Sequence, residues 1–322
     1  MSNDNVCVNV AIIGGGCAGL SAALYCARAE LKPIVFCGEL NDKGGLLIKT
    51  SIVENYPGFS DGILGFDLIE QMQRQAVKYG AILIDSEIVK VDFDDDHKYK
   101  VLTDNEGRVY KCLSVIIATG SKPNKLYLPN EENLWSKGIS SCAVCDGALY
   151  KNKRIAVIGG GDTAMEEALF LTKFSNVLLI HRGNSFRASK SMQSRVLNNP
   201  KIKIMYNTVV TKLHGTDYLT GITCETTHDG VDKNNKDIDI DGLFYGIGLK
   251  PNSKVFNGVV ETDEEGYIRV VDVKGYTTAT SGYGIFVAGD VHDKQYKQAV
   301  VACGDGCKAA MDAIHFCDNA DK

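Results

Sequence analysis

A pattern of apolar strand, glycine turn and helix occurs twice in this chain, and it constrains the possible folds more than any other feature. Residues 10–25 read VAIIGGGCAGLSAALY, and residues 155–170 read IAVIGGGDTAMEEALF. One such stretch is often a simple strand–turn–helix connection, but two copies with the same flanks are strong evidence for a shared purpose. The repeat therefore predicts an α/β protein with two Rossmann-like dinucleotide-binding domains.

Both copies have the spacing of a dinucleotide fingerprint, G-x-G-x-x-G/A. Residues without a bulky side chain allow a tight turn and bring a pyrophosphate close to backbone N–H groups. The start of the following helix adds unpaired donors and a positive dipole end. The residues expected to bind are Gly14, Gly16, Ala18 and Gly19 in the first copy, and Gly159, Gly161, Asp162, Thr163 and Ala164 in the second.

The residues after the second strand of each unit indicate which dinucleotide is held. In the first unit, a strand over 33–37 is followed by Glu39, whose carboxylate could accept hydrogen bonds from ribose hydroxyls. In the second unit, the equivalent strand is followed by a basic cluster, which consists of His181, Arg182 and Arg187. Guanidinium groups pair with a 2′-phosphate, whereas a carboxylate repels one. The first site therefore suits FAD and the second NADPH, with ordinary solvated loop charges as the alternative.

Composition narrows the class of protein. The 322 residues are 44% apolar and 23% charged, which is typical of a globular protein large enough for two domains. The net charge of −5 argues against nucleic acid or a membrane surface as a partner. The N-terminal residues lack the features of a secretory signal, and no apolar run approaches a membrane span. We therefore expect a cytoplasmic protein whose 11 cysteines are mostly small buried hydrophobic residues.

The order of the segments predicts that one domain is inserted into the other. An apolar strand over 115–120 closes the first unit, and a glycine-containing stretch over 246–248 closes the second. The residues that remain at the C-terminal end are too few for a domain of their own. We expect an FAD domain made of residues 1–119 and 248–322, an NADPH domain over 120–247, and hinges at the two crossings.

Local patterns predict several further elements. Apolar spacing predicts a helix over 65–79, and alternating residues predict a strand meander over 82–93 and 98–117. A final helix is expected over about 295–316. The Asp-rich stretch over 228–242 is typical of a polar turn region.

The strongest chemical signal is a pair of cysteines separated by two residues. Cys142 and Cys145 enclose Ala-Val and are followed directly by Asp146. This spacing allows a small reducible disulfide ring, and the adjacent acid could manage the proton that thiol–disulfide exchange moves. A structural dithiol is one alternative, and half of a zinc site is another. Zinc would need further ligands, for which Cys303 and Cys307 are the candidates, but their spacing is that of a packed helix, so we expect no metal.

The motifs, taken in order along the chain, resemble those of a known family. They are GGGCAG, ENYPG, IIATG, CAVCDG, GGGDTAMEEA, HRGNSFRAS, GIGLKPN and GIFVAGDV. Together they are similar to the low-molecular-weight thioredoxin reductases of the pyridine-nucleotide disulfide oxidoreductase superfamily. The resemblance covers about residues 8–316, and its most specific element is a dithiol that lies inside the NADPH domain, just before that domain's fingerprint.

The resemblance implies a function and a set of site residues. It implies transfer of a hydride from NADPH to FAD, then of two electrons to Cys142–Cys145 and on to thioredoxin, in a homodimeric enzyme. It implies that Cys142 attacks thioredoxin, that Cys145 faces the flavin and that Asp146 acts as acid and base. Beyond the fingerprints, the implied contacts are Gly44, Gly45, Leu46, Asn55, Ala118, Gly120, Gly289, Asp290, Gln298 and Ala299 for FAD, and Ile247 and Gly248 for NADPH.

Two departures from the family pattern leave room for other functions. Leu46 stands where the family usually has Gln, and Gly183 stands where many members have a second basic residue. A related flavin-dependent dithiol oxidase is one alternative, although it would not need the second nucleotide site. A ferredoxin–NADP reductase would not need the dithiol. A non-catalytic redox or nucleotide sensor would not need the complete relay.

Overall fold

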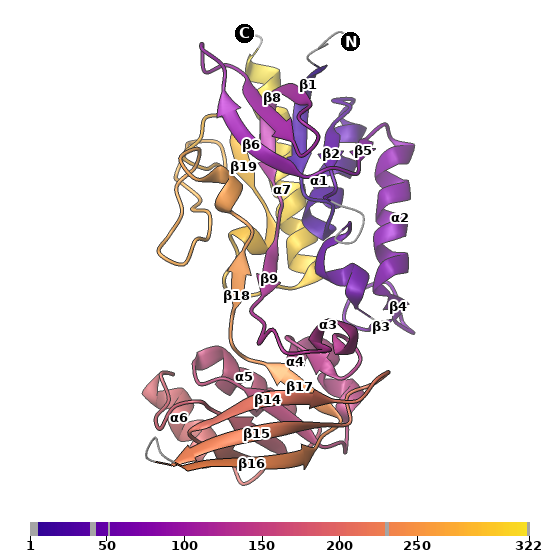
Figure 1. The fold of residues 1–322 in the computed structure, drawn as a ribbon. Coiled ribbons are helices and arrows are strands. Elements are labelled where there is room, and N and C mark those ends of the chain that lie inside the picture. Colours follow the sequence, from indigo (N-terminus) through magenta and orange to yellow (C-terminus); the bar gives the residue numbers. More distant parts are fainter. Residues whose placement is uncertain (1–5, 39–42, 51, 229–231, 321–322) are drawn as a thin grey trace. The chain divides into compact units, whose positions relative to one another are not determined.

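The chain folds into two compact units. The computed structural model describes residues 6–38, 43–50, 52–228 and 232–320. Unit 1 consists of Met1–Lys122 and Lys250–Lys322, and unit 2 of Pro123–Leu249 (Figure 1). Unit 2 is therefore a continuous segment inserted into a discontinuous unit 1. Each unit contains a sheet with parallel strands and helices, which confirms the expected α/β class.

Unit 1 is built on a seven-stranded sheet. Its strands are β1 (Val6–Ile13), β2 (Ile34–Phe36), β5 (Ile82–Ile84), β6 (Ile88–Phe93), β7 (Lys100–Asp104), β8 (Val109–Ile117) and β19 (Ile285–Val287). Along the order β5-β2-β1-β8 the pairs are parallel, and β19 joins β8 in parallel as well. Strands β6, β7 and β8 form the expected antiparallel meander. Segment 82–84 does not belong to that meander, because β5 pairs with β2.

Three helices and several short elements complete unit 1. The helices are α1 (Cys17–Arg28), α2 (Gly65–Lys78) and α7 (Ala299–Ala320). The short elements are the 3₁₀ helices η1 (Gly45–Lys49), η3 (Lys254–Phe256) and η4 (Gly289–Val291), and the paired strands β3 (Ile52–Val53) and β4 (Ile63–Leu64). Helix α2 confirms the helix expected over 65–79.

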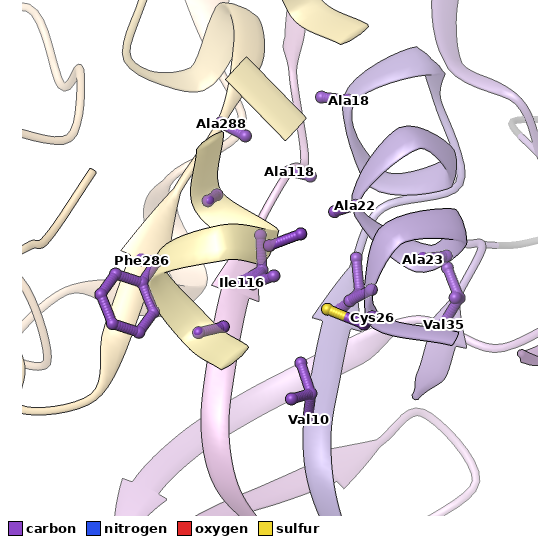
Figure 2. Close-up of a cluster of buried hydrophobic side chains, with 14 of the residues drawn as sticks. Val10, Ala18, Ala22, Ala23, Cys26, Val35, Ile116, Ala118, Phe286 and Ala288 are labelled. Carbon is purple, nitrogen blue, oxygen red and sulfur yellow. The ribbon is translucent and has the colours of Figure 1, made fainter. Parts of the chain in front are cut away.

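A cluster of tightly packed side chains joins the sheet of unit 1 to α1 and α7. Figure 2 shows Val10 of β1 and Ile116 of β8 near Ala22 and Cys26 of α1, and Phe286 of β19 belongs to the same cluster. All five are 2% exposed or less. Because β1, β8 and β19 run in parallel, their carboxyl ends lie at the same edge of the sheet, where ligands bind in open α/β folds. The loops that follow these strands are thus anchored by a rigid core.

Unit 2 has a parallel sheet and an antiparallel one. The order of the parallel sheet is β10 (Ile139–Ser140), β17 (Gly242–Tyr245), β11 (Ile155–Ile158), β12 (Val177–Ile180) and β13 (Ile202–Met205). The antiparallel sheet consists of β14 (Thr208–His214), β15 (Gly221–His228) and β16 (Asp232–Asp239). The helices are α3 (Glu131–Leu134), α4 (Ala143–Asp146), α5 (Asp162–Leu171) and α6 (Lys190–Leu197), with a 3₁₀ turn η2 (Gly147–Tyr150). The two crossing segments, β9 (Ser121–Pro123) and β18 (Leu249–Pro251), pair with each other.

Two sequence-based expectations about local structure are wrong. The last helix begins at Ala299 rather than near 295, because the Asp293 carboxylate accepts the N–H groups of Gln295, Tyr296 and Lys297 in a turn. The polar stretch over 228–242 contains strand β16, whose backbone pairs with β15 along its whole length. Its charged residues suit an edge strand of this kind, where Lys and Asp discourage pairing with other chains.

No helix in the described part of the chain is both long and apolar enough to cross a membrane.

Candidate active site

The two cysteines of the C-x-x-C motif form a disulfide at the start of a short helix in unit 2. Cys142 precedes α4, and its Sγ lies 2.03 Å from that of Cys145. The N–H of Cys145 donates to Cys142 Sγ at 3.2 Å. Both cysteines are half-buried, and Val144 between them is 52% exposed. The motif therefore presents a disulfide that a second protein could approach.

A buried serine links Asp146 to the disulfide turn. The hydroxyl of Ser140, at the end of β10, donates to Asp146 Oδ2 at 2.6 Å and accepts the N–H of Cys142 at 3.1 Å. Burial raises the pKa of Asp146, and the Ser140 hydrogen bond opposes that effect only in part. Asp146 can thus hold a proton next to the sulfurs at a higher pH than an exposed carboxyl can.

A second carboxyl group, Glu167 of α5, contacts the same turn. Its Oε2 accepts the N–H of Ala143, the first of the two residues between the cysteines, at 2.8 Å. Burial raises the pKa of Glu167 to about 8, the Ala143 hydrogen bond opposes this, and the nearby carboxylate of Asp146 adds to it. The sequence analysis missed Glu167. The available signal was its spacing, since it follows the buried Ala164 by three residues and precedes the buried Leu171 by four, which places an acid on the apolar face of the helix.

The second fingerprint forms a glycine turn with an open helix end. Helix α5 begins after Gly161 without any side-chain cap. Gly159 has φ +144, and a Cβ there would lie 2.3 Å from the carbonyl oxygen of Gly246. Asp162 accepts the N–H of Ser189 at 2.9 Å, and this bond lowers the pKa of Asp162. Thr163 is exposed and Ala164 is buried. The loop can therefore approach a phosphate closely with backbone donors.

The basic cluster lies beside that turn. Arg182 and Arg187 are exposed, and neither guanidinium has an ion pair with another described residue. The N–H of Arg187 donates to the carbonyl of Gly160 at 2.8 Å, which ties the arginine loop to the fingerprint. His181 is buried and its Nε2 lies 2.9 Å from the carbonyl of Ser185, so this histidine supports the loop from within. The structure thus brings both arginines to the turn, whereas His181 is not free to meet a ligand.

Ile247 and Gly248, the last residues assigned to the second nucleotide, follow strand β17. Asn124 contacts both, since its side chain donates to the carbonyl of Ile247 at 3.1 Å and its backbone N–H donates to that of Gly248 at 3.0 Å. These contacts belong to the end of unit 2 where the chain leaves it.

The first fingerprint forms the equivalent turn in unit 1. Helix α1 begins after Gly16, again without a side-chain cap or an acidic residue in its first turn. Gly14 has φ +125, and a Cβ there would lie 2.1 Å from the carbonyl oxygen of Ala118. Two segments from elsewhere in the chain adjoin this loop, since Gly45 lies against Gly16 and Gly289 lies against Ala18. A glycine cradle at an uncapped helix start fits the pyrophosphate of a dinucleotide.

The other residues assigned to the flavin have varied surroundings. Asn55 donates to the side-chain oxygen of Gln298 at 3.2 Å, so two expected contacts from distant segments meet. Burial, reinforced by Asp293, raises the pKa of Asp290 to about 6. The Leu46 side chain is 40% exposed. Two of the remaining expected contacts lie at helix starts, Gly19 in the first turn of α1 and Ala299 at the start of α7. Gly44 lies at the turn before η1, and the carbonyl of Gly120 accepts the N–H of Asn252. Glu39 lies outside the described residues.

The zinc alternative finds no support in these groups. Within the described ranges, no group of three or more His, Cys, Asp or Glu side chains is placed to hold a metal ion. Cys142 and Cys145 are bonded to each other, and Cys303 and Cys307 lie on one helix, α7, in unit 1.

Comparisons with known proteins agree with this geometry. The family model described as pyridine nucleotide-disulphide oxidoreductase matches residues 8–306. A thioredoxin reductase of Streptomyces clavuligerus is 46% identical over 96% of this chain and 93% of its own length. One of Dictyostelium discoideum is 44% identical over 95% and 96%. Among solved structures, thioredoxin reductase from Giardia duodenalis has a TM-score of 0.87 and 36% identity, covering 97% of this chain and 99% of its own.

Proposed function

Because this chain belongs to the pyridine nucleotide-disulphide oxidoreductase family, and within it to the thioredoxin reductases, we propose that it reduces the disulfide of thioredoxin with electrons from NADPH. It is an oxidoreductase that uses a flavin and a pyridine nucleotide. The finer assignment is FAD in unit 1 and NADPH in unit 2. The observation that carries the proposal is the Cys142–Cys145 disulfide, whose turn is contacted by two half-buried carboxyl groups in the unit that also holds the second fingerprint.

The residues around each glycine turn support the cofactor assignment. In unit 1, the turn of Gly14 and Gly16 would hold the pyrophosphate of FAD, and the Asn55–Gln298 pair would lie along it. In unit 2, Arg182 and Arg187 would pair with the 2′-phosphate that distinguishes NADPH from NADH. When bound, the flavin accepts a hydride from the nicotinamide and supplies two electrons for the disulfide.

The chemistry of the dithiol balances in two exchange steps. Two electrons and one proton convert the Cys142–Cys145 bond into one thiolate and one thiol. The Cys142 thiolate then attacks a sulfur of the substrate disulfide, which forms a mixed disulfide and releases the other substrate sulfur as a thiolate. Cys145 next attacks Cys142, re-forms the enzyme disulfide and releases the second substrate sulfur. Asp146 is suited to give the leaving thiolate a proton and to take one from Cys145, because burial raises its pKa.

The family resemblance also supports a homodimer and a place in the cytoplasm, and both belong to this proposal.

A dithiol oxidase remains the nearest rival. It would pass electrons from a small dithiol to oxygen and would have no use for the exposed arginine pair at the second fingerprint.

Trapping the mixed disulfide tests which cysteine meets thioredoxin. The probe is a thioredoxin that keeps one active-site cysteine, loaded as its mixed disulfide with thionitrobenzoate. Cys145→Ser should displace the coloured thiolate and form a covalent complex through Cys142, visible on a non-reducing gel. Cys142→Ser should form it far more slowly. A complex formed only through Cys145 would contradict the proposed order of attack.

A further inference from the structure

Two cysteines that the proposed relay does not use meet in unit 1. Nine cysteines lie outside the Cys142–Cys145 disulfide. Cys17 is the first residue of α1, and Cys303 lies in the second turn of α7. These helices pack against each other, and the Ser21 hydroxyl of α1 donates to the carbonyl of Cys303 at 2.8 Å. The two thiols are thus held together by the packing of the unit rather than by a mobile loop.

The sulfur of Cys303 has polar contacts on two sides. It lies 3.7 Å from the carbonyl oxygen of Cys17, and the two cysteines belong to the same small apolar cluster. The hydroxyl of Tyr56 donates to Cys303 Sγ at 3.3 Å. The Tyr56 hydroxyl therefore stabilises negative charge on this sulfur, which favours its thiolate form.

This environment sets Cys303 apart from the other cysteines. Interaction with the Cys17 side chain lowers the pKa of Cys303 to about 7, and the hydrogen bond from Tyr56 contributes to this. Burial acts in the opposite direction. Burial raises the pKa of Cys26 and Cys112 to about 12. The Cys303 side chain and burial both raise the pKa of Cys17. Cys303 is consequently the nucleophile of the pair, and Cys17 keeps its proton.

Tyr56, whose hydroxyl donates to Cys303, also lines a hollow. A hollow of about 470 Å³ is lined by Tyr56, Phe59 and Met72 among other residues of the segment 56–75. Met72 packs against the same apolar cluster as Cys303. Cys303 itself is half-buried, whereas Cys17 is 8% exposed.

We propose that Cys303 and Cys17 form a second redox-active thiol pair, which hydroperoxides oxidise to a disulfide joining α1 to α7. The Cys303 thiolate attacks the O–O bond, takes up one oxygen as a sulfenic acid and releases the other as an alcohol or water after protonation. The Cys17 sulfur then attacks the sulfenic sulfur, so that the S–S bond forms and a second water leaves. The two thiols lose two electrons and the peroxide gains them. A low-pKa cysteine beside a second cysteine is the usual arrangement of thiols that sense peroxide.

The test uses the purified full-length protein with the cofactors it retains. It is treated with hydrogen peroxide, blocked with N-ethylmaleimide, digested without reductant and analysed by mass spectrometry. We expect a linked peptide pair containing Cys17 and Cys303, reversed by dithiothreitol. In Cys17→Ser, Cys303 should stop at a sulfenic acid that dimedone traps. Cys307→Ser, on the same helix, is the matched control and should form the linked pair at the wild-type rate.

Tyr56→Phe provides a variant that keeps both cysteines. Removal of this donor to the thiolate should slow oxidation of Cys303 by up to about tenfold, because a smaller share of the thiol is ionised at neutral pH. The proposal is overturned if Cys303 reacts no faster than Cys307, or if it is oxidised without being linked to Cys17. Neither outcome depends on reduction of thioredoxin, so this proposal and the proposed function can fail separately.

Discussion

At the scale of single residues, the disulfide turn is defined by two carboxyl groups that water solvates poorly. Asp146 bonds to Ser140 and Glu167 bonds to the N–H of Ala143, so each is held within hydrogen-bonding reach of the turn. The Asp146 carboxylate adds to the effect of burial in disfavouring ionisation of Glu167, since like charges in a poorly solvated site repel. At neutral pH the site therefore retains a proton without help from histidine.

The raised pKa of Glu167 predicts a pH-dependent cost to stability. The pKa of Glu167 is about 4.3 in the unfolded chain and about 8 in the fold. Between these values the folded state binds more protons, so stability is greatest below this window and falls as pH rises through it. Glu167→Gln keeps an acceptor for Ala143 and removes the ionisation. Its melting temperature should fall less between pH 5 and pH 8 than that of the wild type.

The neighbouring residue supplies the comparison. Glu166 is exposed on the same helix and only adds to the effect of burial on the pKa of Glu167, so Glu166→Gln should weaken the pH dependence far less than Glu167→Gln. Parallel melting curves for Glu167→Gln and the wild type would show that Glu167 ionises normally.

The sequence was informative for some residues of the site and not for others. Cys142, Cys145 and Asp146 are adjacent in sequence, so a motif was enough to find them. The contact of Glu167 with Ala143 spans 24 positions and depends on how α5 packs on α4. His181 fell within the predicted basic cluster, but its burial followed from packing against Phe186 that no spacing rule encodes.

At the scale of elements, both fingerprints combine a strained glycine with an uncapped helix. Gly14 and Gly159 each have a positive φ and each abut a carbonyl oxygen from a neighbouring strand end. The two turns are thus equivalent in geometry as well as in sequence. This explains why the glycine pattern alone located both loops, whereas the start of α7 was misplaced by a turn that only Asp293 determines.

Gly159→Ala should destabilise unit 2 strongly. A Cβ would lie 2.3 Å from the backbone oxygen of Gly246, in a region of φ that other residues rarely adopt. Backbone strain alone is worth about 1–3 kcal/mol, so with the clash we expect a loss of about 3 kcal/mol or more in urea unfolding. Gly161→Ala should cost about 1 kcal/mol or less, because its Cβ meets nothing within 4 Å. Equal costs would refute this account of the turn.

The arginine loop should determine nucleotide preference. Each charge-assisted hydrogen bond contributes about 1.5–3 kcal/mol, so replacing both Arg182 and Arg187 with Ala should raise the apparent KM for NADPH by about tenfold or more. The KM for NADH should hardly change, because NADH has no 2′-phosphate. Arg195→Ala, which removes one positive charge from α6, should leave both values unaltered. Equal losses with the two nucleotides would mean that the pair has only a structural role.

At the scale of the whole molecule, the inserted arrangement could be anticipated because the second fingerprint interrupts the first unit. Two crossings had to exist, and the chain passes from one unit to the other at Lys122–Pro123 and Leu249–Lys250. The antiparallel sheet of β14, β15 and β16 could not be anticipated in the same way. Its edge strand has a polar sequence, and the pairing comes from the backbone rather than from an apolar pattern.

The central claim is that electrons pass from NADPH through a flavin to Cys142–Cys145 and then to thioredoxin. It is tested most directly by mixing the purified protein with NADPH and oxidised thioredoxin without oxygen, and following both nucleotide oxidation and thioredoxin thiols. The account predicts repeated turnover with one NADPH consumed for each thioredoxin disulfide reduced, and its loss in both Cys142→Ser and Cys145→Ser. Thioredoxin reduction that persists in either variant, or a wild-type protein that oxidises NADPH without producing thioredoxin thiols, would contradict it.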